Sequence, residues 1–234
     1  MVVCRQTDPE KYLLRRRPAT LSLRLSIFSL IAALVSGSAG FAQEPEVHPA
    51  DASLDRFLTE ATTLQADFEQ ELRDSDGEII EVAVGSLSLR RPNQFFWEYR
   101  EPLEQVILAD GENLWIYDVD LAQATVTPLD ELASATPAML LSGDIGIRDS
   151  FEAIEYFSAE GTDWVQLAPT ESGADFRSIL VGFSAGELVS LELLDALDQV
   201  TRINFADVVE NAHLPADQFS FDPPRGVDVI GEPR

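Results

Sequence analysis

The sequence predicts a mainly β (α+β) domain built on one curved antiparallel sheet. Apolar residues alternate with polar ones along most of the chain after residue 63, which is the pattern of half-buried strands. Turn-forming residues separate these runs, as they do in consecutive hairpins. Helical spacing is confined to one segment before the strands and one insert among them. Because so few helices cannot cover both faces of about ten strands, the sheet either closes into a barrel or has its concave face covered by the insert.

The first predicted element is a helix that leads into a strand. Apolar residues follow helical spacing at Leu54, Phe57, Leu58, Ala61 and Leu64. From Leu64 onward the apolar residues alternate, and Phe68 continues that face. We therefore expect the helix to give way to a strand near Leu64. The segment Asp74–Gly77 (DSDG) then predicts a hairpin turn.

The next two strands carry the most apolar faces of the sequence. One face of the second strand holds Ile80, Val82 and Val84. We expect Gly85 to shift the phase, as a β-bulge does, so that Leu87 and Leu89 continue the same face. After a turn at 91–93, the third strand presents Phe95, Trp97 and Tyr99 on one side.

The remaining elements are a hairpin, a helical insert and further strands. The predicted strands are Val106–Ala109, Leu114–Tyr117, Ala124–Thr127, Trp164–Ala168, Phe176–Phe183, Glu187–Leu194 and Val200–Val208. Residues 129–150 break the alternation with small and helix-favouring residues, so one or two short helices are expected there. Pro137 suits the first turn of the second helix, where its missing N–H costs nothing.

The N-terminus is typical of an export signal. Six of the sixteen Lys and Arg residues lie within the first 24 positions, an eleven-residue apolar run follows at 25–35, and small residues come next. We expect a cleavable signal peptide at 1–42, a flexible segment at 43–50 and one domain at 51–234. Eleven apolar residues are too few to span a bilayer core of about 30 Å, although an uncleaved N-terminal anchor is the alternative. Cys4 precedes the apolar run, so a lipid anchor is not expected.

Composition limits the partners and the chemistry. The chain has 16 basic and 41 acidic residues, a formal charge of −25, and it has no lysine after Lys11. Nucleic acid and anionic membrane surfaces would repel such a protein. The single cysteine excludes an intramolecular disulfide framework. The expected product is a soluble, acidic, disulfide-free protein outside the cytoplasm.

The candidate catalytic and metal motifs are weak. The segment Gly182–Gly186 matches GxSxG around Ser184, but that motif requires a strand, a sharp turn and a helix. Here residues 187–194 alternate as a strand, so a hairpin turn is predicted, and a secreted esterase around Ser184 is the weakest alternative. His48 and His213 cannot build a conventional zinc site, and the acidic turn at 74–78 lacks the downstream glutamate of a calcium loop. We expect no enzyme, no metal and no cofactor.

Four collinear segments resemble the LolA family of periplasmic outer-membrane lipoprotein carriers. They are RRPNQFFWEY (90–99), ADGENLWIYDVDLAQATVTPL (109–129), ATPAMLLSGD (135–144) and FSFDPPRGV (219–227). The resemblance covers almost all of 52–230. It implies an incomplete antiparallel β-barrel whose hydrophobic concavity is covered by a lid of short helices.

The resemblance also implies roles for individual residues. Arg91 matches the arginine that hydrogen-bonds to the lid backbone and holds the lid closed. Ala138 stands where a larger residue is common. The alternating strand faces add Phe68 and Leu87 to the residues that the resemblance implies. The expected acyl-chain cavity therefore comprises Phe68, Leu87, Phe95, Trp97, Ile107, Met139, Leu140 and Leu141.

The implied function is non-catalytic transport. Such a carrier accepts lipoproteins from an inner-membrane ABC transporter of the LolCDE type, shields their acyl chains, and delivers them to an outer-membrane acceptor (LolB or an equivalent). The alternative is a periplasmic LolA-like module that binds or senses lipids without delivering lipoproteins.

Overall fold

The computed structural model describes residues 47–132, 136–142, 147–171 and 174–234. The predicted signal peptide at 1–42 lies outside these residues. The helices are α1 (Pro49–Glu60), η1 (Leu129–Glu131), α2 (Pro137–Ser142), α3 (Ile147–Ser150) and η2 (Ala216–Phe219). The strands are β1 (Thr63–Arg73), β2 (Ile79–Arg90), β3 (Gln94–Glu101), β4 (Gln105–Asp110), β5 (Asn113–Asp118), β6 (Gln123–Pro128), β7 (Phe151–Ala159), β8 (Thr162–Pro169), β9 (Phe176–Ser184), β10 (Glu187–Asp195), β11 (Val200–Glu210) and β12 (Asp228–Ile230).

All the strands of the described residues form one sheet, in the order β12-β6-β5-β4-β3-β2-β1-β11-β10-β9-β8-β7. Neighbouring strands are antiparallel except β12 and β6, which run parallel. The strands at the two ends, β7 and β12, do not pair with each other in this order, so the sheet is open. The prediction of a mainly β domain with few helices is confirmed. Of the two arrangements left open by the sequence, the closed barrel is not the one observed.

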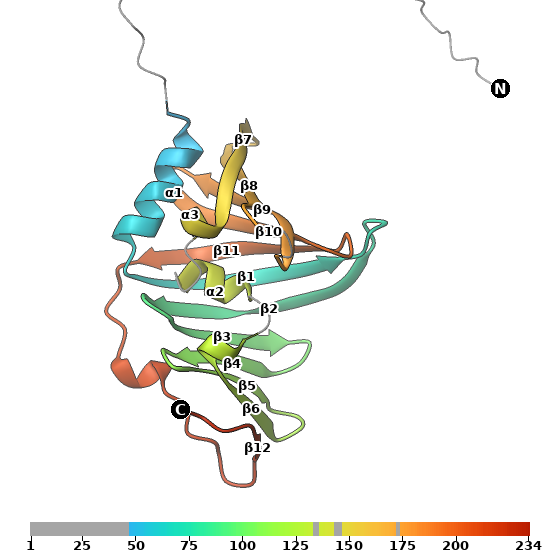
Figure 1. Cartoon of the computed structure of the whole chain (residues 1–234), viewed down its shortest axis with the longest axis vertical. Helices are drawn as coiled ribbons and strands as arrows, with labels where there is room; N and C mark the ends of the chain where they lie inside the picture. Colours follow the sequence, from blue (N-terminus) through green and yellow to red (C-terminus); the bar gives the residue numbers. More distant parts are fainter. Residues whose placement is uncertain (1–46, 133–135, 143–146, 172–173) are drawn as a thin grey trace, which may run out of the picture. The chain divides into compact units, whose positions relative to one another are not determined.

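The helices α1 and α2 pack against one face of the sheet, which we call the inner face. α2 contacts β2 and β3, whereas α1 contacts β7, β8 and β9 (Figure 1). Pro137 opens α2 as predicted. Within the described residues, no helix is long and apolar enough to cross a bilayer.

α1 begins earlier than the sequence predicts. Its N-cap is His48, whose Nδ1 accepts a hydrogen bond from the Ala50 N–H at 3.2 Å, and Pro49 occupies the first turn. The Ala50 side chain is fully buried. The expected flexible segment at 43–50 is therefore wrong at its last two residues, because a capped start and a buried alanine extend the helix.

The predicted phase shift at Gly85 is wrong. β2 keeps one phase from Glu81 to Arg90, and its inward residues there include Ala83, Gly85, Leu87 and Leu89. Ile80 and Val82 instead lie on the outer face and are about half exposed. The irregularity belongs to β3, because Tyr99 pairs with Gly85 and Glu101 with Val84, which leaves Arg100 between them without a partner residue in β2.

Two strands were not predicted. β7 has only one buried residue, Phe151, so its sequence lacks a clear apolar alternation. β12 has three exposed residues and is held by pairing with β6. Both are edge strands, which need only one neighbour and little burial.

Candidate functional site

Cross-strand pairing arranges the inner face of β1 to β5 in rows that differ in polarity. The first row is Leu64, Leu89, Phe95, Ala109 and Leu114. The second row is Ala66, Leu87, Trp97, Ile107 and Ile116. The third row is Phe68, Gly85, Tyr99, Gln105 and Asp118. The first two rows are wholly apolar, and polar groups enter at the third, so the inner face changes character along the strands.

The eight predicted cavity residues come together in one apolar cluster. They are Phe68, Leu87, Phe95, Trp97, Ile107, Met139, Leu140 and Leu141. Seven of them are buried, and Ile107 is partly buried at the margin of the cluster. The last three belong to α2, so this helix inserts its apolar side chains against the rows of the sheet. Ala138 is buried as well.

An aromatic group marks the boundary between the apolar and the polar rows. The Phe68 ring lies 4.6 Å from the Trp97 ring and 5.3 Å from the Tyr99 ring, measured between centroids. Phe68 also pairs with Gly85 across β1 and β2. A Cβ on Gly85 would lie 2.6 Å from the Phe68 ring and 1.9 Å from the Glu98 carbonyl oxygen. The absence of a side chain at Gly85 therefore leaves room for this ring.

Arg91 joins the ends of two helices. Its Nε and Nη2 donate to the Leu141 carbonyl oxygen at 3.2 and 2.9 Å, at the end of α2. Its Nη1 donates to the carbonyl oxygens of Phe57, at 2.8 Å, and Ala61, at the end of α1. The guanidinium carbon also lies 4.6 Å from the centroid of the Phe57 ring. One side chain in the turn after β2 thus holds the C-terminal carbonyl groups of both helices.

The environment of Arg91 makes these bonds strong. A cation at the C-terminal end of a helix is favoured by the helix dipole, and unpaired carbonyl groups there need donors. Burial lowers the pKa of the Arg91 guanidinium, because removal from water disfavours its charge. The carbonyl groups therefore replace the hydration that the guanidinium has lost.

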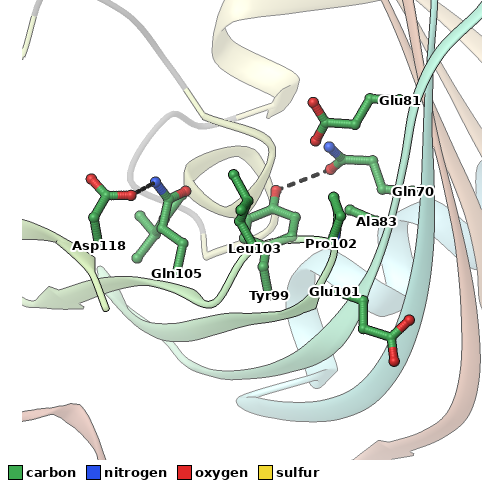
Figure 2. Close-up of a pocket in the computed structure, with 10 residues that line it drawn as sticks. Gln70, Glu81, Ala83, Tyr99, Glu101, Pro102, Leu103, Gln105 and Asp118 are labelled. Atoms are coloured by element: carbon green, nitrogen blue, oxygen red, sulfur yellow. Dashed lines mark hydrogen bonds between the residues drawn. The ribbon is translucent and has the colours of Figure 1, made fainter. Parts of the chain in front are cut away.

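A pocket of about 300 Å³ opens at the polar end of the rows (Figure 2). Its lining residues are Gln70, Glu81, Ala83, Tyr99, Glu101, Pro102, Leu103, Gln105, Ile107 and Asp118. The Tyr99 hydroxyl donates to Gln70 Oε1 at 3.1 Å, and Gln105 Nε2 donates to Asp118 Oδ1 at 2.7 Å. Burial raises the pKa of the Tyr99 hydroxyl to about 12, so this group is neutral at ordinary pH.

Of the residues that line this pocket, the sequence predicts only Ile107 as a cavity residue. Tyr99 was placed on the right face of its strand but was not named as a site residue. Gln105 and Asp118 are not among the predicted site residues, although strand alternation puts Gln105 on the same face as Ile107. The pocket combines five strands and a loop, so its detection requires the register of the sheet.

The other motifs have ordinary structural roles. Ser184 ends β9, and Ala185 and Gly186, with φ of 50° and 86°, form a two-residue turn into β10. This arrangement confirms the predicted hairpin and lacks the helix of a nucleophile elbow. In the acidic turn at 74–78, Asp74 Oδ1 accepts from the N–H groups of Asp76 and Glu78. No group of three potential metal ligands occurs among the described residues.

Comparison with known proteins identifies the family. A family model described as "Outer membrane lipoprotein carrier protein LolA" matches residues 59–222. The chain belongs to the LolA family. This LolA-family chain is 40% identical over 191 residues to the outer-membrane lipoprotein carrier protein of Methylococcus capsulatus, covering 82% of the chain and 91% of that relative. The corresponding protein of Halorhodospira halophila is 37% identical over 215 residues, covering 92% and 95%.

A solved structure supports the fold alone. An uncharacterized conserved protein from Thermus thermophilus superposes with a TM-score of 0.50 at 14% identity, covering 77% of this LolA-family chain and 98% of that structure.

Proposed function

We propose that the chain is a periplasmic carrier that shields the acyl chains of lipoproteins on the inner face of its sheet. The observation that supports this most strongly is the pair of wholly apolar rows across five strands, covered by a short helix held by Arg91. Each buried CH₂ of an acyl chain contributes about 0.8 kcal/mol, so long chains need a large apolar surface to cross water. The names of the family and of the relatives specify lipoproteins as the cargo class.

In this proposal α2 is the movable lid of an incomplete barrel. Met139, Leu140 and Leu141 occupy the apolar space in the observed state. The pocket at the polar end of the rows, about 300 Å³, is at the lower end of the range of about 300–1,000 Å³ for small-ligand sites. Several acyl chains therefore require α2 to move away. The observed arrangement is then the closed, unloaded state, and Arg91 is the latch that stabilises it.

The latch explains how a carrier releases its cargo. Hydrogen bonds that stabilise the closed state reduce the fraction of protein ready to bind, and the apparent affinity falls in proportion. Moderate affinity allows a second protein to remove the cargo. The polar row and its pocket give a place for the polar end of the cargo, while the acyl chains lie on the first two rows.

The proposed route runs between two membranes. The carrier takes lipoproteins from a LolCDE-like ABC transporter in the inner membrane and passes them to an outer-membrane acceptor, LolB or an equivalent, as a monomer. It performs no catalysis and binds no nucleic acid. A cleaved signal peptide at 1–42 would place it in the periplasm.

The test is release of lipoproteins from spheroplasts that hold newly made lipoproteins in the inner membrane. Purified protein is added, and the soluble fraction is examined for a one-to-one complex of the protein with lipoprotein. We expect ATP-dependent release when the cognate transporter is present. An authentic family carrier serves as the positive control. Binding of acyl probes without any release in the cognate system would overturn the delivery role and support the lipid-binding alternative.

A further inference from the structure

A second arginine connects the helical insert to α1. Arg148 lies in α3, the short helix that follows α2 in sequence. Its Nη2 donates to Asp51 Oδ1 at 2.6 Å and to Asp55 Oδ1 at 2.6 Å, and its Nε donates to Asp55 Oδ1 at 3.0 Å. Asp51 and Asp55 are four residues apart in α1, so both carboxylates lie on the same face of that helix.

Neighbouring side chains hold the acceptor in place. The Tyr156 hydroxyl of β7 donates to Asp51 Oδ1 at 2.8 Å. The Tyr156 ring stacks on His48, the N-cap of α1, with centroids 5.5 Å apart. Burial raises the pKa of Asp51, but the hydrogen bonds from Arg148 and Tyr156 outweigh it and hold that pKa below its usual range. Asp51 is thus an ionised and well-positioned partner for Arg148.

The two arginines bind different parts of α1, one through backbone carbonyl groups and the other through carboxylates. Arg91 contacts backbone carbonyl oxygens at the C-terminal end of the helix, next to α2. Arg148 belongs to α3 and contacts the carboxylates of Asp51 and Asp55, which lie nearer the N-terminal end of α1. The side chains of Arg148, Asp51 and Asp55 are 35%, 27% and 61% exposed, so this contact is an ion pair in reach of solvent.

We propose that Arg148 is a second tether of the lid, a positioning residue that holds α3 against α1 and makes lid opening sensitive to ionic strength. The inference rests on the proposed role of α2 as a lid. Salt screens half-exposed ion pairs, since the Debye length falls from about 30 Å at 0.01 M to about 3 Å at 1 M. The buried hydrogen bonds of Arg91 to neutral carbonyl groups are screened far less. The free energy of lid opening therefore has one part, from Arg148, that depends on salt concentration and another part, from Arg91, that depends on it little.

Hydrogen exchange of the lid amides tests this directly. The Leu140 N–H, which donates to the Thr136 carbonyl oxygen at 3.3 Å, reports the opening of α2. In the wild-type protein we expect its exchange to be about two- to tenfold faster at about 1 M than at about 0.01 M salt, the range for one or two half-exposed ion pairs. Arg148→Gln should exchange at the faster rate at both salt concentrations. Arg148→Lys, which keeps the charge, should retain part of the salt response.

A matched control separates the tether from the general effects of losing an arginine. Arg177 forms an exposed ion pair with Asp198 in the β9–β11 region, outside the helical insert. Arg177→Gln should keep the wild-type exchange of Leu140 and its salt response. Exchange of strand amides in β1 and β2 should be the same in all variants, which verifies that they are folded.

Two results would overturn the tether. One is a Leu140 amide that exchanges in Arg148→Gln as slowly as in the wild-type protein at low salt. The other is a salt response in that variant equal to the wild-type response. Neither measurement uses cargo. Failure of lipoprotein release in spheroplasts would therefore leave this result standing, and failure of the tether would leave the carrier function standing.

Discussion

The two ends of the inner face differ in what holds them together. At the Arg91 end, the first row is apolar across five strands and is covered by α2. At the pocket end, Tyr99, Gln105 and Asp118 face a solvent-connected space, and Leu103 is 66% exposed. Burial thus stabilises one end, and hydrogen bonding shapes the other. Such a surface orients a cargo that has an apolar body and a polar end.

The largest effect on stability is expected from the Arg91 end. Phe95 is 1% exposed in the first row, so Phe95→Ala should lower the free energy of unfolding by about 3–5 kcal/mol. At the pocket end, Leu103→Ala should change it by less than about 0.5 kcal/mol, since that side chain is mostly in water. Urea unfolding of the two variants measures both. Equal losses would contradict the division of the inner face into a buried end and an open end.

Arg91→Leu should change the behaviour of the lid more than that of the sheet. Hydrogen bonds to charged groups contribute about 1.5–3 kcal/mol, so loss of the latch should raise the open fraction by about ten- to a hundredfold. The variant should still accept lipoproteins from spheroplasts but transfer them poorly to the acceptor, because the closed state no longer competes with the cargo. Transfer from the purified complex to acceptor protein measures this, and normal transfer would refute the latch.

The neighbouring arginine provides the control for that experiment. Arg90 Nη2 donates to the carbonyl oxygens of Leu214 and Pro215, and its guanidinium lies over the Phe219 ring. Among the described residues, its hydrogen bonds are to the C-terminal segment and none is to α2. Arg90→Leu should therefore transfer lipoproteins normally, even if it is somewhat less stable.

Gly85 lies at the boundary between the two ends. Gly85→Ala places a Cβ against the Glu98 carbonyl group and the Phe68 ring, and we expect a loss of about 1–3 kcal/mol of unfolding free energy. Ser86→Ala, at the next position of β2, should change the stability little because Ser86 is only partly buried. Urea unfolding decides between these outcomes. A Gly85→Ala variant as stable as Ser86→Ala would show that the ring has room to move.

Strand alternation correctly predicted the inward face of β3. It placed Phe95, Trp97 and Tyr99 together because a strand has a period of two. It failed at Ile80 and Val82, which are about half exposed. β-branched residues also favour exposed strand positions, and alternation shows which residues share a face but not which face is buried.

The sequence predicts only part of the candidate site. The partners of Arg91 are backbone carbonyl groups, which leave no trace in the sequence, so its place there came from family resemblance. The pocket likewise depends on which residues of β3, β4 and β5 lie opposite one another. Pairing register is a property of the whole sheet, and local patterns do not determine it.

The last effect depends on pH and concerns the protonation of Tyr99 at the pocket end. Its pKa is about 12 in the folded protein, above the value of about 10 for an exposed tyrosine. Above pH 10 the unfolded chain therefore loses this proton while the folded protein keeps it, so stability falls as pH rises, by at most about 1.4 kcal/mol per pH unit. Tyr99→Phe removes the ionisable group, and its unfolding free energy should fall less steeply between pH 10 and pH 12. Equal slopes in urea unfolding would mean that Tyr99 is as hydrated as an exposed tyrosine, and that the polar row is open to water where the structure shows it half-buried.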